Sequence, residues 1–415
     1  MKQLFRRGLL AAAMGAALAA AGGAGAQDIK LGGLATLEGP FAVPGQDSMR
    51  GIELALSEAN SMAGGKKIIL IKGSSNANPD VAVNAARKLV EQDKVDVLVG
   101  PLSGSEGLAV KDYAKTQPNT TFVNGSSAAQ DTTLRDPAPN FFRFSTDGAQ
   151  WMAGLGEYIY KTKGYKKVAV VAEDYSFPYT QVLGFMVPFC AAGGKVPEKF
   201  WVPLGTKDYS SVIAKLPQDV DAIYVALGGA DAVNFLTQYQ QAGGNKPLVG
   251  GSITTDQTVL AAKGRIRDAL IGTPAAGPIA DSWDNPKWKA FVAAYKKKFP
   301  DGLPSPSLFA HAYYVETKAV LAALDQVKGD LSGNQAKFRQ ALSKLKLDTP
   351  TGPVALDENR NAIADIFLTE VAVGDGGVLY NKVIKVIPQV NQSMNMDKAK
   401  FLALGPVGRT NPECK

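Results

Sequence analysis

The sequence predicts an α/β fold with parallel sheets, because short runs rich in β-branched residues alternate with longer stretches of helical spacing. Eight runs are expected to be strands: DIKLGGLATL, KIILIKG, VDVLVG, TTFVNG, KKVAVVAED, EKFWVPL, DAIYVALGG and PLVGGS. VDVLVG is apolar throughout, which is typical of a parallel strand covered on both faces. The 415 residues, 46% of them hydrophobic, are enough for two domains with substantial cores.

The stretches between the strands carry helix signals. In 79–93, Asn78 is a natural N-cap, Pro79 fits the first helical position, and apolar residues recur along one stripe. Three more helices are expected at 286–299, 305–327 and 334–345. The chain then changes to alternating segments separated by turn signals at 357–359 and 374–377, which predicts antiparallel hairpins at the end of the fold.

The N-terminus, MKQLFRRGLLAAAMGAALAAAGGAGAQ, has the three parts of a signal peptide. A basic head precedes an apolar run, and Ala24-Gly25-Ala26 is a small-residue cleavage site. We therefore predict a signal peptide over 1–26 and a periplasmic mature protein that begins near Gln27. The pair Arg6-Arg7 is compatible with twin-arginine export, although Sec export is the default.

Cys190 and Cys414 are the two cysteines of the chain. Because an exported protein meets an oxidising compartment, we predict a disulfide between them, with two unpaired thiols as the alternative. The formal net charge is +7, and the basic residues are spread along predicted helices. The densest basic run, 296–298, shares its helix with an apolar face, so it is expected to be solvated and the sequence argues against a nucleic-acid partner.

The sequence contains no recognisable catalytic motif. His311 is its single histidine, which excludes a histidine-rich metal site and makes any Ser-His-Asp triad depend on this residue. Nucleophile-elbow, phosphate-loop, Cys-x-x-Cys and zinc-protease motifs are absent from the sequence. We therefore predict no catalytic residue, no metal and no cofactor, with a secreted hydrolase that uses His311 as the alternative.

Small polar residues recur where predicted strands end and helices begin. The segments are GPLSGSEG, NGSSAAQ, GGADA and GSITTD. Each alone could be a tight turn, but the carboxyl ends of parallel strands share one edge of a sheet, where ligands bind. Helix N-termini at that edge favour an anionic group. Together, the four segments favour a cleft that holds a small carboxylate.

These segments, with DIKLGGLATLEGPFAVPGQDSMRGIELALSEAN, AEDYSFP and GPVALDENR in this order, resemble type I periplasmic solute-binding proteins of ABC importers. The resemblance covers about residues 28–390. Within this family, the sequence is similar to the leucine/isoleucine/valine-binding proteins. It implies two Rossmann-like lobes with three hinge crossovers that close on a ligand. Lobe one would be 27–146 plus 275–351, and lobe two 147–274 plus 352–415. It also implies a monomer that delivers its ligand to a membrane permease.

The resemblance also implies the ligand-binding residues. In lobe one, amides and hydroxyls would hold the carboxylate at Leu102, Ser103, Gly104, Ser105, Gly125, Ser126 and Ser127, and Phe41 would form a wall of the cleft. In lobe two they fall on Asp147, Tyr175, Phe177, Gly229, Asp231 and Ser252, and Tyr313 would reach the cleft from a late helix. Asp174, beside Tyr175, is expected to orient its loop.

The sequence departs from the amino-acid-binding members at Ser252, where those members carry an acid that pairs with the ligand ammonium. An ammonium buried without a counter-charge costs several kcal/mol, so Asp231 or Asp256 would have to replace that acid. With its aromatic loops, the sequence resembles the subgroup that binds aromatic acids of the benzoate or cinnamate type. Binding of branched-chain or other amino acids, or a role as a sensory ligand-binding subunit, are the alternatives.

Overall fold

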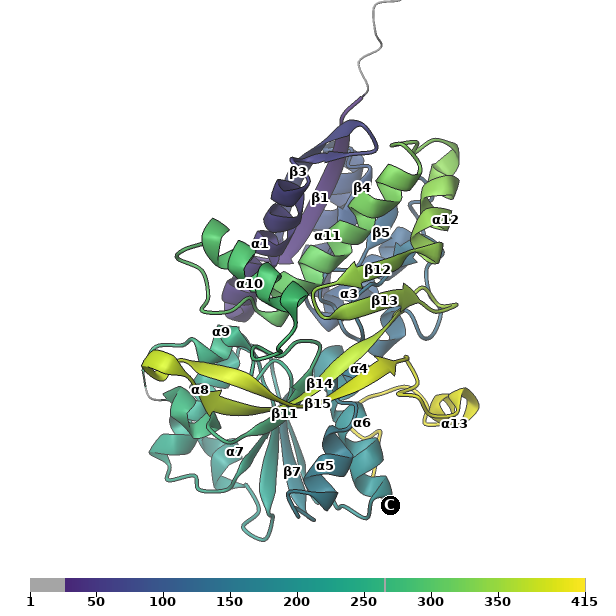
Figure 1. Ribbon diagram of the computed structural model, residues 1–415. Coiled ribbons are helices and arrows are strands. Elements are labelled where there is room, and N and C mark those ends of the chain that lie inside the picture. Colours follow the sequence, from purple (N-terminus) through teal and green to yellow (C-terminus); the bar gives the residue numbers. More distant parts are fainter. Residues whose placement is uncertain (1–26, 265, 415) are drawn as a thin grey trace, which may run out of the picture.

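The structure is a computed structural model that describes residues 27–264 and 266–414, so the predicted signal peptide lies outside the described residues. The chain forms two lobes, each a sheet flanked by helices, which lie one above the other in Figure 1. This arrangement confirms the predicted α/β class with two lobes. Within the described residues, no helix has both the length and the apolar character needed to cross a membrane.

The first lobe contains a sheet of six strands among the described residues, in the order β2-β3-β1-β4-β5-β6. Its strands are parallel except where β2 pairs with β3. The strands are β1 (Ile29–Thr36), β2 (Met62–Ala63), β3 (Lys66–Ser75), β4 (Val97–Val99), β5 (Thr121–Val123) and β6 (Phe141–Phe142). The helices of this lobe are α1 (Ala42–Glu58), α2 (Pro79–Arg87), α3 (Gly104–Ala114), α10 (Pro286–Lys298), α11 (Leu308–Gln326) and α12 (Ala336–Lys344).

The second sheet has nine strands among the described residues, in the order β12-β13-β14-β11-β10-β9-β7-β8, with β15 paired to β14. Its end strands β12 and β13 lie beside the helices of the first lobe in Figure 1, and the other strands belong to the second lobe. The strands are β7 (Val168–Glu173), β8 (Lys199–Val202), β9 (Ala222–Ala226), β10 (Leu248–Gly250), β11 (Pro274–Gly277), β12 (Lys346–Thr349), β13 (Gly352–Leu356), β14 (Ala362–Val373) and β15 (Leu379–Val390). The helices are α4 (Gly148–Trp151), α5 (Leu155–Lys161), α6 (Ser176–Ala191), α7 (Ser210–Ala214), α8 (Gly229–Gln241), α9 (Gln257–Leu260) and α13 (Lys398–Leu402).

All eight predicted strands are present, as β1, β3, β4, β5, β7, β8, β9 and β10. The predicted hairpin at the end of the fold is also confirmed, because β14 and β15 pair antiparallel. Strand β11 was not predicted, because it reads PAAG and has no β-branched residue. This strand forms because it is buried between β10 and β14, so tertiary packing decides its conformation.

The predicted helices differ from the structure mainly at their first residues. Asn78 caps α2 as predicted, by accepting from the backbone N–H of Asp80. The helix expected at 305–327 begins at Leu308, because the Ser307 side chain caps it. The helix expected at 334–345 begins at Ala336, because Asn334 and Gln335 have φ values of 54° and 59°.

Three segments connect the two lobes. The first, which follows β6, and the third, which runs from β13 into β14, lie side by side. The Arg143 N–H donates to the Arg360 carbonyl, and Arg143 forms an isolated bridge with Asn361. The second crossing follows Gly277, since β11 belongs to the second sheet. The predicted division between residues 274 and 275 therefore falls inside a strand of the second lobe.

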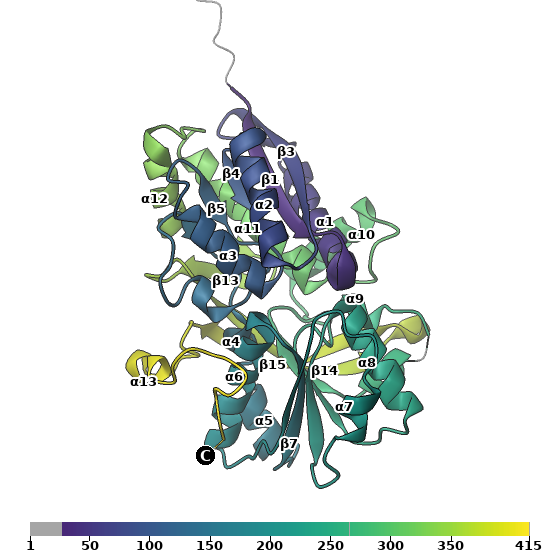
Figure 2. The same ribbon diagram turned by 180° about the vertical axis from the view of Figure 1, so that it is seen from behind.

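The C-terminal tail packs along the second lobe. Figure 2 shows it passing from α13 along α6. Lys199 and Trp201 of the edge strand β8 donate to the carbonyls of Thr410 and Arg409. Cys190 and Cys414 are bonded in the structure, with Cα atoms 5.4 Å apart, a separation that a disulfide allows.

Replacing Cys414 with serine is expected to lower the free energy of unfolding of the mature protein by about 2 kcal/mol. The bond joins residues 224 positions apart, so it restricts the unfolded chain strongly. Lys199 and Trp201 still hold the tail in the folded variant, so the change should act mainly on the unfolded chain. Urea unfolding of the variant and the wild type measures the difference. Two free thiols in the mature wild type would contradict the pairing.

Candidate functional site

The candidate site is a cavity between the two lobes. The first lobe contributes Phe41, Leu102, Ser103, Gly104, Ser126 and Phe309, and the second lobe contributes Trp151, Tyr175, Phe177 and Ile253. The cavity has a volume of about 10 Å³, which is room for about one water molecule. A larger ligand therefore needs the lobes to separate or the side chains of the wall to shift.

Aromatic rings from both lobes form most of the cavity wall. The Phe41 ring of the first lobe lies 6.3 Å from the Tyr175 ring of the second, measured between centroids. Tyr175 lies at the same distance from Phe177, and Phe177 packs edge-on against Trp151 at 5.5 Å. Because Phe41 and Tyr175 come from different lobes, the aromatic wall is complete only when the lobes are together.

The N-terminus of α3 forms the polar side of the cavity. Ser103 caps this helix, and a capping box pairs its hydroxyl with the Glu106 N–H and its own N–H with the Glu106 carboxylate. The N–H groups at the start of a helix lack intrahelical partners and carry partial positive charge. Gly104, the first residue of α3, and Ser126 both line the cavity, and the Ser126 hydroxyl donates to the Leu102 carbonyl at 3.3 Å. This side of the cavity is therefore suited to an anionic group.

The lobes touch along a seam beside the cavity, where glycines allow close approach. A Cβ built on Gly104 would lie 2.8 Å from the Phe177 Cβ, and one built on Gly229 would lie 2.4 Å from the Pro40 carbonyl oxygen. The Ser105 and Ser176 hydroxyls form a hydrogen bond across the seam at 3.1 Å. The structure thus shows the lobes closed on one another.

The structure brings seven of the fifteen predicted ligand-binding residues to this cavity. They are Phe41, Leu102, Ser103, Gly104, Ser126, Tyr175 and Phe177. The other eight do not line it: Ser105, Gly125, Ser127, Asp147, Gly229, Asp231, Ser252 and Tyr313. Of these eight, Ser105 and Gly229 lie at the seam.

Three of the remaining residues make contacts inside the first lobe. The Tyr313 hydroxyl donates to the Leu34 carbonyl, and its ring covers Gly125 so closely that a Cβ there would lie 2.3 Å from it. Ser127 packs against Gly107 of α3 in the same way. These residues support the loops that carry the cavity wall.

The last three predicted residues have protein partners in the second lobe. Asp147 caps α4 by accepting from Ala149 and Gln150, and burial raises the pKa of its carboxyl. The Asp231 carboxylate accepts from the Gly205 N–H, and burial raises its pKa to about 6. Ser252 accepts from the Gln181 amide at 2.6 Å. The structure does not place these three side chains in the cavity wall.

Sequence reasoning missed Trp151, Ile253 and Phe309 in the cavity wall. Ile253 directly follows the predicted Ser252, and Phe309 lies four residues before the predicted Tyr313 on α11. Residues four apart share a helix face, but Tyr313 does not line the cavity, so the spacing alone did not indicate Phe309. Trp151 ends the short helix α4, which the sequence analysis did not predict.

None of the ten cavity-lining residues is charged. The nearby acids accept hydrogen bonds from the protein, and Glu106 and Glu173 each keep one buried oxygen without a partner among the described residues. Asp256 accepts from the Leu308 N–H at 2.8 Å, and burial raises its pKa to about 7. Glu173 accepts from the Gly228 N–H, and burial raises its pKa well above the usual value. Asp174 accepts from Tyr179 and Arg409, which fixes the loop that carries Tyr175, consistent with the role expected for Asp174.

His311 lies outside the interlobe cavity, in α11. Its Nε2 lies 3.2 Å from the Thr351 hydroxyl, and burial lowers the pKa of its ring to about 3. At neutral pH the imidazole is therefore uncharged and a poor proton acceptor. In the part of the chain that the structure describes, no group of three or more His, Cys, Asp or Glu residues could hold a metal ion.

Glu316 of α11 binds the first hinge crossing through the N–H groups of Phe144 and Ser145. Burial outweighs these two bonds and raises its pKa from 4.5 to about 8. Folding therefore favours the protonated acid. The stability from this group is complete below about pH 4.5 and is lost as the pH rises toward about 8.

We expect replacement of Glu316 by glutamine to flatten the decline in stability between these pH values. The group should contribute on the order of 1 kcal/mol per pH unit within this window. Urea unfolding near the two ends of the window compares the variant with the wild type and with Glu198→Gln, which changes an exposed acid. Identical pH profiles for wild type and Glu316→Gln would contradict the assignment.

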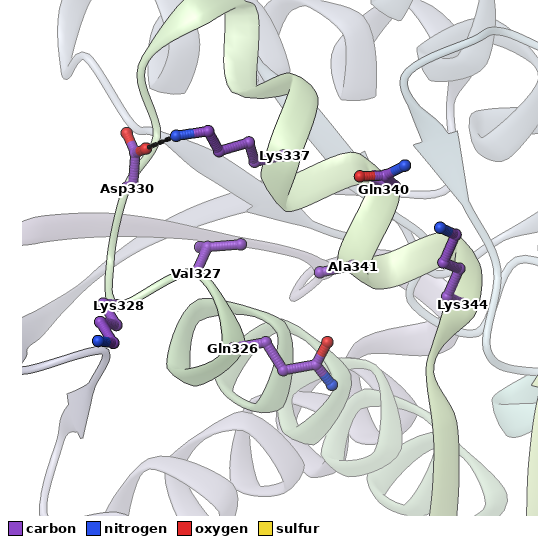
Figure 3. Close-up of a pocket in the computed structure, with 8 residues that line it drawn as sticks. All are labelled: Gln326, Val327, Lys328, Asp330, Lys337, Gln340, Ala341 and Lys344. Carbon is purple, nitrogen blue, oxygen red and sulfur yellow. Dashed lines mark hydrogen bonds and ion pairs between the residues drawn. The ribbon is translucent and has the colours of Figure 1, made fainter.

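A larger depression lies on the first lobe, between the end of α11 and α12 (Figure 3). Its volume is about 460 Å³, and lysines surround it: Lys328, Lys337 and Lys344. Lys337 already pairs with Asp330 at 2.9 Å. Since this depression is open and contains none of the predicted residues, the interlobe cavity remains the candidate site.

A family profile, a curated relative and two solved structures all relate this chain to periplasmic binding proteins. A family profile described as periplasmic binding protein matches residues 28–377. A Leu/Ile/Val-binding protein homolog 7 from Brucella suis biovar 1 is 30% identical over 356 residues, with 82% of this chain and 86% of the relative covered. A solute binding protein of an ABC transporter from Rhodopseudomonas palustris BisB5, in complex with 3,4-dihydroxy benzoic acid, has a TM-score of 0.81 at 27% identity, covering 88% of this chain and 98% of its own. Another from R. palustris, in complex with benzoate, has a TM-score of 0.80 at 25% identity, with 90% and 99% covered.

Proposed function

Because the chain belongs to the periplasmic binding protein family, we propose that it is the solute-binding component of an ABC importer and captures a small aromatic acid between its lobes. The observation that carries this proposal is the composition of the cavity wall. Five of the ten lining residues are aromatic and none is charged. Flat apolar walls suit a flat apolar ring.

The polar side of the cavity is suited to the carboxylate of such a ligand. The α3 N-terminus supplies N–H groups and partial positive charge. The Ser126 hydroxyl donates to the Leu102 carbonyl at 3.3 Å and would turn from that carbonyl to bind the acid group. No arginine or lysine lines the cavity, so backbone and hydroxyl groups would hold the acid group.

An α-amino acid fits this cavity less well. Its ammonium would need a counter-charge, and Asp231, Asp256 and Glu173 all accept backbone N–H bonds outside the wall. Burying an unpaired ammonium costs several kcal/mol. The bound benzoates of two structural neighbours support the aromatic class, whereas the name of the Brucella relative favours branched-chain amino acids as the competing ligand class.

In this proposal the protein is a periplasmic monomer without catalytic activity, and its macromolecular partner is the membrane permease of the importer. The low pKa of His311 and its place outside the cavity leave the hydrolase alternative without a working base.

A thermal-shift panel on the mature protein tests the ligand class. The panel compares benzoate, hydroxybenzoates and cinnamates with leucine, isoleucine and valine. A ligand at 100 times its dissociation constant adds about 2.7 kcal/mol to the stability. We expect the transition to rise with aromatic acids, and Tyr175→Ala to reduce that rise. A rise with the branched-chain amino acids alone would overturn the proposal.

A further inference from the structure

A second small cavity lies at the hinge, on the far side of the wall of the interlobe cavity. Its volume is about 20 Å³. Segments from all three crossings border it, together with α11. The residues that matter here are Thr146, Trp151, Pro278, His311, Val315 and Thr351. We call this space the hinge cavity.

Trp151 separates the two cavities. The residue lines both the interlobe cavity and the hinge cavity. The ring N–H donates to the Thr146 hydroxyl at 2.7 Å, and the ring packs against Phe177. The preceding residue, Gln150, fixes the backbone by donating to the carbonyls of Ala362 and Val390. These contacts therefore fix the indole in place as a partition between the two cavities.

The two sides of this partition differ in chemistry. The groups suited to a carboxylate, at Ser103, Gly104 and Ser126, line the interlobe cavity and are not part of the hinge cavity. The hinge cavity has mostly apolar walls, and its polar lining residues are Ser145, Thr146, His311, Thr351 and Asp365. Among these, the neutral His311 ring and the Thr351 hydroxyl lie 3.2 Å apart. These groups could hydrogen-bond a phenolic hydroxyl, which both donates and accepts.

We infer that Trp151 sets the length of the ligand, confining it to aromatic acids whose carboxylate is attached directly to the ring. This inference rests on the proposed function, because it takes the carboxylate to lie at α3. A ligand whose carboxylate lies at α3 and whose other end extends past the aromatic wall meets the indole of Trp151. Acids with a two-carbon spacer, such as cinnamates, would need the space that the indole fills. The benzoate class is thus preferred over the cinnamate class.

Dissociation constants for an acid series test the partition. The series is benzoate, phenylacetate, 3-phenylpropanoate, cinnamate and 4-hydroxycinnamate. One methylene changes affinity in an apolar pocket by about 10-fold or more, so we expect wild type to prefer benzoate to cinnamate by at least that factor. Trp151→Ala should reverse the preference, and adding Thr351→Val should remove only the gain from the 4-hydroxyl group.

Trp201→Ala is the matched control, because it removes a half-buried indole that lines neither cavity. It should leave the preference of the wild type unchanged. If Trp151→Ala weakens all acids by one common factor, or changes none, the partition is overturned.

Failure of the proposed function gives a different result. In that case wild type binds leucine and no aromatic acid, and the length comparison is made with alanine, leucine, phenylalanine and homophenylalanine. If Trp151→Ala then binds the longer amino acids more tightly than the wild type does, the role of Trp151 in limiting ligand length is supported and the aromatic-acid proposal is wrong. A panel in which nothing binds either protein counts against both.

Discussion

Replacing Gly104 with valine is expected to weaken ligand binding at least 100-fold, or by about 2.7 kcal/mol. A Cβ at this position would lie 2.8 Å from the Phe177 Cβ and 2.9 Å from the Phe177 backbone nitrogen. Neither atom can move unless the start of α6 moves with it. The added side chain therefore holds the lobes apart, and the wall that Phe41 and Tyr175 complete in the closed form is lost.

The fold itself should tolerate this change. Gly104 is the first residue of α3 and needs no left-handed backbone. Urea unfolding should accordingly give nearly the same free energy as the wild type. Gly408→Val is the control, because a Cβ there meets open space. If Gly104→Val bound ligand within a few-fold of the wild type, closure on the ligand would not occur along this seam.

Replacing Arg143 with alanine is expected to lower the free energy of unfolding by about 3–5 kcal/mol. The guanidinium is fully buried at the first hinge crossing. It donates to the Asn361 side chain at 2.6 Å, the Ala129 carbonyl at 2.7 Å and the Thr133 hydroxyl at 2.6 Å. Its removal takes one donor from each of these three acceptors and leaves the buried Asp147 without its nearest cation, 3.7 Å away.

Arg143→Lys separates charge from geometry at this position. Lysine keeps the positive charge but lacks the planar fork that reaches three acceptors at once. We therefore expect the free energy of unfolding of Arg143→Lys, measured by urea unfolding, to lie between that of the wild type and that of the alanine variant. A loss below about 1 kcal/mol for Arg143→Ala would show that the guanidinium does not hold the first and third crossings together.

The strands could be predicted because their residues favour burial on both faces wherever they lie in the chain, as in VDVLVG. The α3 N-terminus was predictable for a similar reason, since Ser103 and Glu106 have the spacing of a capping box. Asp147 and Gln150 also have the spacing of a capping box. This spacing indicates that Asp147 caps a helix, whereas the resemblance assigned it to the ligand.

Which side chains point into the cavity could not be predicted, because their direction depends on contacts with residues distant in the sequence. Ser252 and Ile253 are neighbours, yet Ser252 turns toward Gln181 and Ile253 toward the cavity. Trp151 reaches the cavity because Gln150 anchors α4 to residues 212 and 240 positions away. A single sequence does not show such pairings.

Calorimetric titration of benzoate and of leucine into one preparation of the mature wild-type protein tests the central claim most directly. The uncharged aromatic wall and the α3 N-terminus predict saturable binding of benzoate and no measurable binding of leucine. Tight binding of leucine without binding of benzoate would contradict the account, because an acid outside the described wall would then have to neutralise the ammonium.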